Sequence, residues 1–223
     1  MFTLISDRDW FAHVDIYCER LGPGLWAEPL NALSNLAFIL AAIIVWPHTK
    51  GLPLARVLAV NLFIIGVGSG LFHTFANTWS STADVVPILA YILIYIFATT
   101  TRIFNAPWWG GVLAVLLYFP FAYLVGQAVT NMFGTLNGSV QYIPVVLLLI
   151  GYGIFGMDRD PKAATGILIG AGILAVSVTF RTFDHAVCHA LPIGIHYVWH
   201  CLNALMLGWM IVVYARMRRP VAF

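Results

Sequence analysis

Seven apolar stretches, each close to the length that a transmembrane helix needs, follow one another along the 223-residue chain. A hydrocarbon core of about 30 Å requires roughly 20 apolar residues per helix. Turn-like sequences such as PHTKGLP, FNAPWW and GMDRDPK separate the stretches. The chain is therefore predicted to be one integral membrane domain, residues 1–223, with an N-terminal segment 1–29 and spans at 30–47, 54–75, 84–103, 108–125, 138–157, 163–181 and 194–215.

The composition supports a membrane class. Charged residues make up only 9% of the chain and apolar residues 61%, whereas a soluble domain carries about 25% charged residues. The net charge of +2 gives no reason to expect a nucleic-acid partner. The first twenty residues, MFTLISDRDWFAHVDIYCER, are mixed and polar and do not resemble a cleavable signal peptide.

The distribution of basic residues predicts the orientation. Seven spans place the two termini on opposite sides, and Lys and Arg concentrate on the cytoplasmic side. Three basic residues fall on the N-terminal side and eight on the other, which predicts an extracytoplasmic or lumenal N-terminus and a cytoplasmic C-terminus. The first group is Arg8, Arg20 and Arg181; the second is Lys50, Arg56, Arg102, Arg159, Lys162, Arg216, Arg218 and Arg219.

Five polar or ionisable side chains within the predicted spans gather at one depth. Such groups are costly in hydrocarbon and mark functional sites by default. All five fall towards the N-terminal side of the membrane: at the end of the second span, at the opening of the third and in the first half of the seventh. They are Ser69, His73, Asp84, His196 and His200.

The spacing of these residues predicts a metal site. Residues four apart share one face of a helix, so His196 and His200 can aim at one point. If the second and seventh spans pack together, His73 joins them. Three neutral histidines with an open position form the ligand set of a catalytic zinc site, and Asp84 lies on the next span. We therefore predict an all-α membrane protein whose seven transmembrane helices enclose an intramembrane metal site. In the alternative, these groups only hydrogen-bond one another and lock the helices.

The glycines beside Ser69, in the sequence GVGSGLFH, favour close helix packing. No strand precedes them, so a nucleotide-binding loop is not expected.

Taken together, these motifs resemble the alkaline ceramidase family, part of a wider superfamily of seven-helix membrane hydrolases that includes the adiponectin receptors. The resemblance rests on Ser69-x-x-x-His73, Asp84 eleven residues later and His196-x-x-x-His200, and extends to YCER, WAEPLNALSN and FDHAVCHA. It implies a zinc-dependent hydrolase that cleaves ceramide, or a related lipid amide, into a sphingoid base and a free fatty acid.

The resemblance also implies a role for each motif residue. His73, His196 and His200 would bind zinc. Asp84 would orient or deprotonate the attacking water, and Ser69 would donate a hydrogen bond to the oxyanion. The substrate would be a lipid drawn sideways from the bilayer.

A second metal site is implied near the N-terminus. Glu19 and Glu28 match the acidic calcium site of animal-type ceramidases, and Asp15 matches it with a one-residue offset. Leu21 stands where an amide ligand is expected. Three carboxylates could hold a hard cation such as Ca²⁺. The alternative is a solvated acidic turn in which Glu28 caps the first helix.

The cysteines divide into two classes. Cys18 and Cys188 both fall on the predicted outer side, where an oxidising compartment allows pairing, and the resemblance supports a disulfide between them. Cys201 follows a histidine ligand but points in another direction, so it is predicted to be a small core residue. In the sixth loop, Asp184 matches a family position with a structural or ligand-supporting role, and His185 and His189 are interpreted as loop residues.

Other functions remain open at this stage. A retinal protein is excluded because the only lysines, Lys50 and Lys162, lie in predicted loops. A non-catalytic receptor, a b-type haem protein with His73 as an axial ligand, and a proton-coupled transporter using the His/Asp cluster as a relay are the alternatives.

Overall fold

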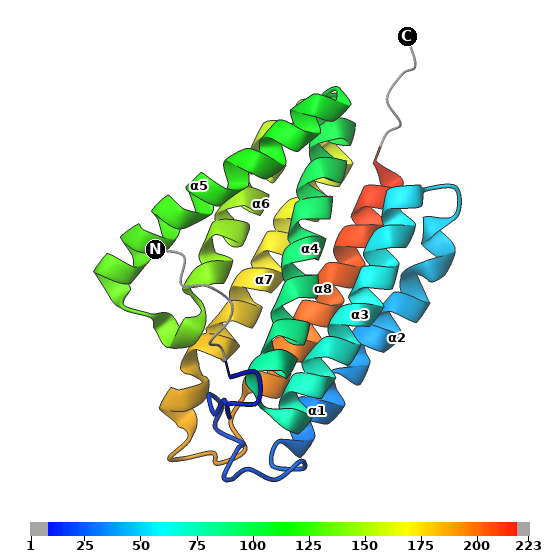
Figure 1. Ribbon diagram of the computed structural model, residues 1–223. Coiled ribbons are helices and arrows are strands. Elements are labelled where there is room, and N and C mark those ends of the chain that lie inside the picture. Colours follow the sequence, from blue (N-terminus) through cyan, green and yellow to red (C-terminus); the bar gives the residue numbers. More distant parts are fainter. Residues whose placement is uncertain (1–8, 218–223) are drawn as a thin grey trace.

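The computed structural model describes residues 9–217, which form helices with no β-strand in that range (Figure 1). The predicted all-α class is confirmed. In order, the helices are α1 (Pro29–Ser34), α2 (Leu36–Val45), η2 (Trp46–Thr49), α3 (Pro53–Phe75), α4 (Thr78–Ile103), α5 (Trp108–Phe133), η3 (Leu136–Gly138), η4 (Val140–Tyr142), α6 (Ile143–Gly156), α7 (Pro161–Val187) and α8 (His196–Arg216).

Within the described range, six helical segments are long and apolar enough to cross a membrane, so the chain is a multi-pass helical membrane protein. They are Pro29–Thr49, Pro53–Phe75, Thr78–Ile103, Trp108–Phe133, Pro161–Val187 and His196–Arg216. The predicted span at 138–157 is shorter than expected. Its first residues form 3₁₀ turns, and α6 itself has 14 residues, or about 21 Å at 1.5 Å per residue.

Four predicted boundaries are wrong, and local interactions explain two of them. The fourth span, predicted to end at residue 125, continues to Phe133. The third span begins at Thr78 because Asn77 and Ser80 form a reciprocal capping box, so Asp84 lies inside α4 and not at its start. The predicted loop after residue 181 is helical as far as Val187, since no Gly or Pro interrupts it. The first span is divided at Asn35 into α1 and α2.

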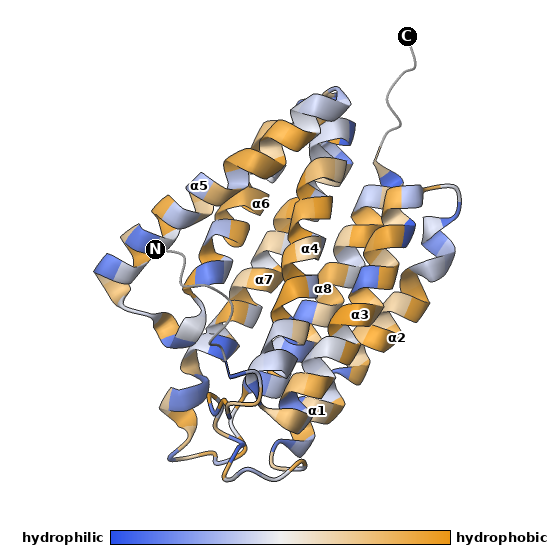
Figure 2. Ribbon diagram, viewed as in Figure 1, coloured by the Kyte–Doolittle hydropathy of each residue, from blue (hydrophilic) through white to orange (hydrophobic). Residues whose placement is uncertain are grey.

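The bundle has a central helix and a peripheral one. The helix α8 packs against α7, α2 and α3, whereas α5 contacts mainly α4 and α6 at one edge (Figure 1). Hydrophobic residues predominate in the middle of the helices, and hydrophilic residues are more frequent towards their ends (Figure 2). The N-terminal segment lies across the end of the bundle where α3 ends and α8 begins, which we call the site end (Figure 1).

Glycine allows the close helix contacts expected from the sequence. A Cβ at Gly68 would lie 2.1 Å from the carbonyl oxygen of Ala83, so α3 and α4 touch backbone to backbone there. A Cβ at Gly166 would lie 2.7 Å from a methyl of Val213, and this contact brings α7 against α8. Small residues serve the same purpose in membrane helices generally.

Candidate metal centre

Three histidines from two helices form a buried cluster at the site end. His73 lies in the last turn of α3, and His196 and His200 lie in the first two turns of α8. Their exposed fractions are 1%, 1% and 2%. One nitrogen from each ring lies within 4.8 Å of the other two, so a single ion could contact all three. The predicted convergence of His73, His196 and His200 is confirmed.

Hydrogen bonds on the outer side of two rings fix their orientation. The Nδ1 atom of His73 lies 2.5 Å from Oε2 of Glu28. The Nδ1 atom of His200 lies 2.7 Å from the hydroxyl of Ser34, which itself donates to the carbonyl of Asn31. The Ser34 hydroxyl therefore accepts from His200. In both rings Nδ1 therefore carries the proton, and the lone pair on Nε2 is free to bind a metal ion.

Two ring nitrogens of the cluster lack hydrogen-bond partners in the described part of the chain. Nε2 of His73 and Nδ1 of His196 are buried and have no hydrogen-bond partner among residues 9–217. A buried polar atom left unpaired costs roughly 1–3 kcal/mol. A metal ion would satisfy both lone pairs at once. The residues therefore fit a zinc ion, which binds readily to neutral imidazole nitrogens. In many catalytic sites three histidines bind the zinc.

Asp184 positions the start of α8. It is 1% exposed, and its Oδ1 accepts hydrogen bonds from the backbone N–H of Ile195 at 2.7 Å and of His196 at 3.0 Å. Its Oδ2 accepts from the N–H of Cys18 at 3.0 Å. Gly194 completes the turn with a φ of +63°, and a Cβ there would lie 2.3 Å from Oδ1 of Asp184. Asp184 thus orients His196 through the backbone.

The N-terminal segment closes over the cluster. Cys18 and Cys188 are joined in a disulfide with Cα atoms 5.4 Å apart, which ties the segment to the end of α7. The neighbouring Tyr17 stacks on the ring of His196, with centroids 3.8 Å apart and planes inclined by 22°. The segment is therefore part of the site wall.

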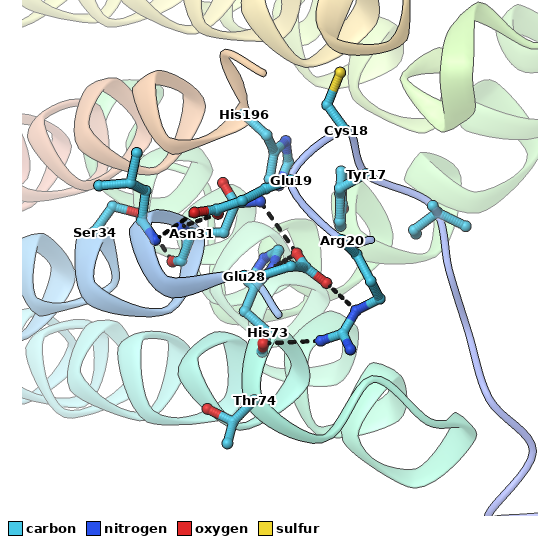
Figure 3. Close-up of polar contacts among 12 residues, drawn as sticks. Tyr17, Cys18, Glu19, Arg20, Glu28, Asn31, Ser34, His73, Thr74 and His196 are labelled. Carbon is cyan, nitrogen blue, oxygen red and sulfur yellow. Dashed lines mark hydrogen bonds and ion pairs between the residues drawn. The ribbon is translucent and has the colours of Figure 1, made fainter. Parts of the chain in front are cut away.

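Arg20 and Glu28 form a buried ion pair beside His73 (Figure 3). Nε of Arg20 lies 2.5 Å from Oε1 of Glu28, and Nη2 donates to the backbone carbonyl of His73 at 3.1 Å. Burial acts to raise the pKa of Glu28, but hydrogen bonds from His73, Arg20 and Asn31 outweigh it and hold the pKa below its ordinary value. Glu28 is therefore a carboxylate with both oxygens engaged.

The carboxylates predicted to hold calcium do not fit that ion. Both oxygens of Glu19 accept backbone N–H groups, from Leu30 at 2.7 Å and Asn31 at 2.8 Å, which caps α1. Burial nevertheless raises the pKa of Glu19. Asp15 is exposed. Oε1 of Glu28 is already paired with the guanidinium of Arg20. Across residues 9–217, the three do not form a metal-binding group.

Ser69 and Asp84 meet at the Gly68 contact between α3 and α4. Ser69 is buried and its side chain lies beside the carboxylate of Asp84. Asp84 is half-buried and interacts electrostatically with His73 and Arg181. The structure thus brings the predicted base and the predicted oxyanion donor together, next to the histidine cluster.

Arg181 lies beside the site, which the sequence did not reveal. It was counted only for its charge, as the last residue of the predicted span 163–181, but it lies inside α7 and is 8% exposed. It donates to the hydroxyl of Tyr17 at 2.6 Å, and its guanidinium lies 5.5–5.7 Å from the ring centroids of Tyr17, Tyr142 and Trp199. Burial raises the pKa of Tyr17, so its hydroxyl stays protonated. A cation is thus held beside Asp84.

The remaining predicted residues lie outside the cluster. His185 is exposed and its Nε2 lies 2.8 Å from the carbonyl of Ile16, and His189 is exposed too. Cys201 is exposed, so its prediction as a core residue is wrong. Its neighbour His200, by contrast, is buried.

A scan against protein-family models gives no match, and a search of curated proteins finds no matching relative. The resemblance to alkaline ceramidases therefore stays a hypothesis that rests on the quoted residues.

Proposed function

We propose that the protein is a zinc-dependent intramembrane amide hydrolase that cleaves ceramide or a related lipid amide to a sphingoid base and a free fatty acid. The observation that carries this proposal is the buried cluster of His73, His196 and His200, whose inner nitrogens include two without a partner among residues 9–217. Ser69 and Asp84 lie together beside it. The resemblance to alkaline ceramidases supplies the reaction.

Zinc bound by three histidines supplies a Lewis acid and lowers the pKa of bound water to about 7. Asp84 would accept the proton of the attacking water. Ser69 would donate a hydrogen bond to the carbonyl oxygen as negative charge develops there. The C–N bond then breaks, and Asp84 returns its proton to the leaving amine. Water adds OH to the acyl carbon and H to the nitrogen, so the atoms balance.

A small apolar cavity lies near the cluster, among α4, α6, α7 and α8, with a volume of about 50 Å³. It begins one helical turn beyond His200, at Asn203, and is lined mainly by apolar and aromatic side chains. These include Tyr95, Tyr142, Leu149, Leu174 and Met210. The lining suits the apolar part of a lipid, but a ligand pocket is usually several times larger, so the helices would have to move apart to admit an acyl chain.

The geometry argues against a haem site. The ring centroids of His73, His196 and His200 are 4.6–5.4 Å apart. Rings this close leave no space between them for a macrocycle that needs an axial ligand on each face.

Two measurements on detergent-purified protein test the proposal. We expect about one zinc per chain by elemental mass spectrometry and hydrolysis of a fluorescent ceramide. Asp84→Asn should lower kcat by about 10²–10⁴ while zinc content stays unchanged. Asp158→Asn, at an exposed turn position, is the control and should retain full activity.

Two results would contradict the proposal. Normal turnover in Asp84→Asn would place the base elsewhere. An intact protein with neither zinc nor hydrolysis would favour a structural cluster or a proton relay.

A further inference from the structure

The guanidinium of Arg20 lies at the centre of a closed set of acceptors. Besides Glu28 and the carbonyl of His73, it contacts the carbonyls of Gly22 at 3.2 Å and Gly24 at 3.3 Å. Its side chain is 0% exposed and that of Glu28 is 2% exposed. Four oxygen atoms from three parts of the chain thus surround one buried positive charge; Figure 3 shows the contacts with Glu28 and His73.

The position of this charge suggests its purpose. Glu28 holds the imidazole of His73 through Nδ1, and Arg20 holds the other oxygen of the same carboxylate. Arg20 also binds the carbonyl of His73, which lies in the last turn of α3 where carbonyls lack helical partners. Both the ring and the backbone of His73 are therefore fixed by contacts that include Arg20.

We propose that Arg20 is a positioning residue for the metal centre and acts as a built-in cation, so that this site needs no calcium. The inference rests on the zinc site of the proposed function but not on the reaction. Removing a charge partner from a buried pair leaves the other charge uncompensated. Without Arg20, Glu28 would have no cation to hold it in place, and the Nδ1 hydrogen bond of His73 would loosen.

A lysine could not replace Arg20 fully. The guanidinium uses separate N–H groups for Glu28 and for the carbonyl of His73, whereas an ammonium is a compact point charge on a flexible stem. Arg20→Lys should therefore fall between the native protein and Arg20→Met.

The first test is the zinc affinity of purified protein, measured by competition with a chromophoric chelator. Changes to groups that orient metal ligands cost 10–100-fold in affinity. Because Arg20 acts one residue further away, we expect about a tenfold loss in Arg20→Met. Arg56→Met removes an exposed arginine at the start of α3 and should bind zinc as the native protein does.

A double-variant cycle separates positioning from general destabilisation. If Arg20 acts largely through Glu28, Arg20→Met combined with Glu28→Gln should lose clearly less zinc affinity than the sum of the two single losses. Additive losses would overturn the proposal, as would native zinc affinity in Arg20→Met.

Calcium provides a test on the native protein that does not depend on any variant folding. Elemental analysis after dialysis against 1 mM CaCl₂ and removal of free ion should find no stoichiometric calcium, and zinc affinity should be the same with calcium and with a matched concentration of NaCl. One calcium per chain, or zinc affinity that rises with calcium, would overturn the proposal and leave the hydrolase function untouched.

Discussion

The helices α8 and α5 lie in the same bundle but differ in how they are used. The most apolar stretch of α5 is more hydrophobic than that of α8, yet only 6% of it is buried, against 61% for α8. In a bilayer, hydropathy shows that a helix is in the membrane but not whether it lies at the centre, because lipid tails are as apolar as leucine. Buried polar residues distinguish the central helix: α8 carries His196, His200 and Asn203, all buried.

Close packing and interhelical hydrogen bonds hold α8 at the centre of the bundle. Along α8, small residues of α7 allow close approach, as at Gly166, and side chains tie the helices together. The indole N–H of Trp209 donates to the carbonyl of Gly166 at 2.8 Å, and the hydroxyl of Ser177 donates to the carbonyl of Trp199 at 3.0 Å. On α5, by contrast, only Gly111 and Tyr118 are buried.

The largest effect is expected from loss of a histidine on α8. His200→Ala leaves two ligands, and stoichiometric zinc should disappear from the purified protein together with hydrolysis. The control is Cys201→Ala, the next residue on the same helix, which is exposed and should keep one zinc per chain. Full zinc occupancy in His200→Ala would show that His200 is not a metal ligand.

Overpacking should distinguish the two helices by stability. Gly166→Leu places a side chain against Val213, whose β-branched side chain adjusts little, and should lower the stability by about 1–3 kcal/mol. Gly126→Leu, on α5, meets only a methyl of Val140 at 3.8 Å from its Cβ. Thermal unfolding in detergent should show a clearly lower Tm for Gly166→Leu, and equal values would contradict the assigned roles.

A smaller loss is expected at the cap of α8. Asp184→Asn keeps an acceptor for Ile195 and His196 but replaces Oδ2, which accepts from Cys18, with an amide that can only donate there. We expect zinc affinity to fall about tenfold, measured by chelator competition. Asp158→Asn should show no change. A loss of stability without loss of affinity would make Asp184 structural only.

The smallest effect is expected on α5. Leu116 is 60% exposed, so Leu116→Ala should alter stability by no more than about 0.5 kcal/mol and leave zinc content unchanged. A large decrease in Tm would show that α5 is covered by protein at this position.

The sequence predicted those parts of the site that depend on local spacing. His196 and His200 share a helix face, and His73 and Asp84 fall at the same depth, so their proximity followed from period and topology. The contacts of Glu28 with His73 and of Ser34 with His200 depend on how α1 meets α3 and α8, which no local pattern encodes. Arg181 was counted only for its charge because it was the last residue of the predicted span 163–181, whereas α7 continues to Val187. Cys201 was misplaced because apolar periodicity cannot separate lipid from core.

The residues of the site are spread over most of the chain, from Glu28, which holds the ring of His73, to His200 in the last helix. A ribosome delivers these segments in order, N-terminal first, so the two imidazoles of α8 arrive only after every other described helix has been made. A chain that stops before α8 therefore lacks two of the three histidines, and the cluster can form only late in biosynthesis.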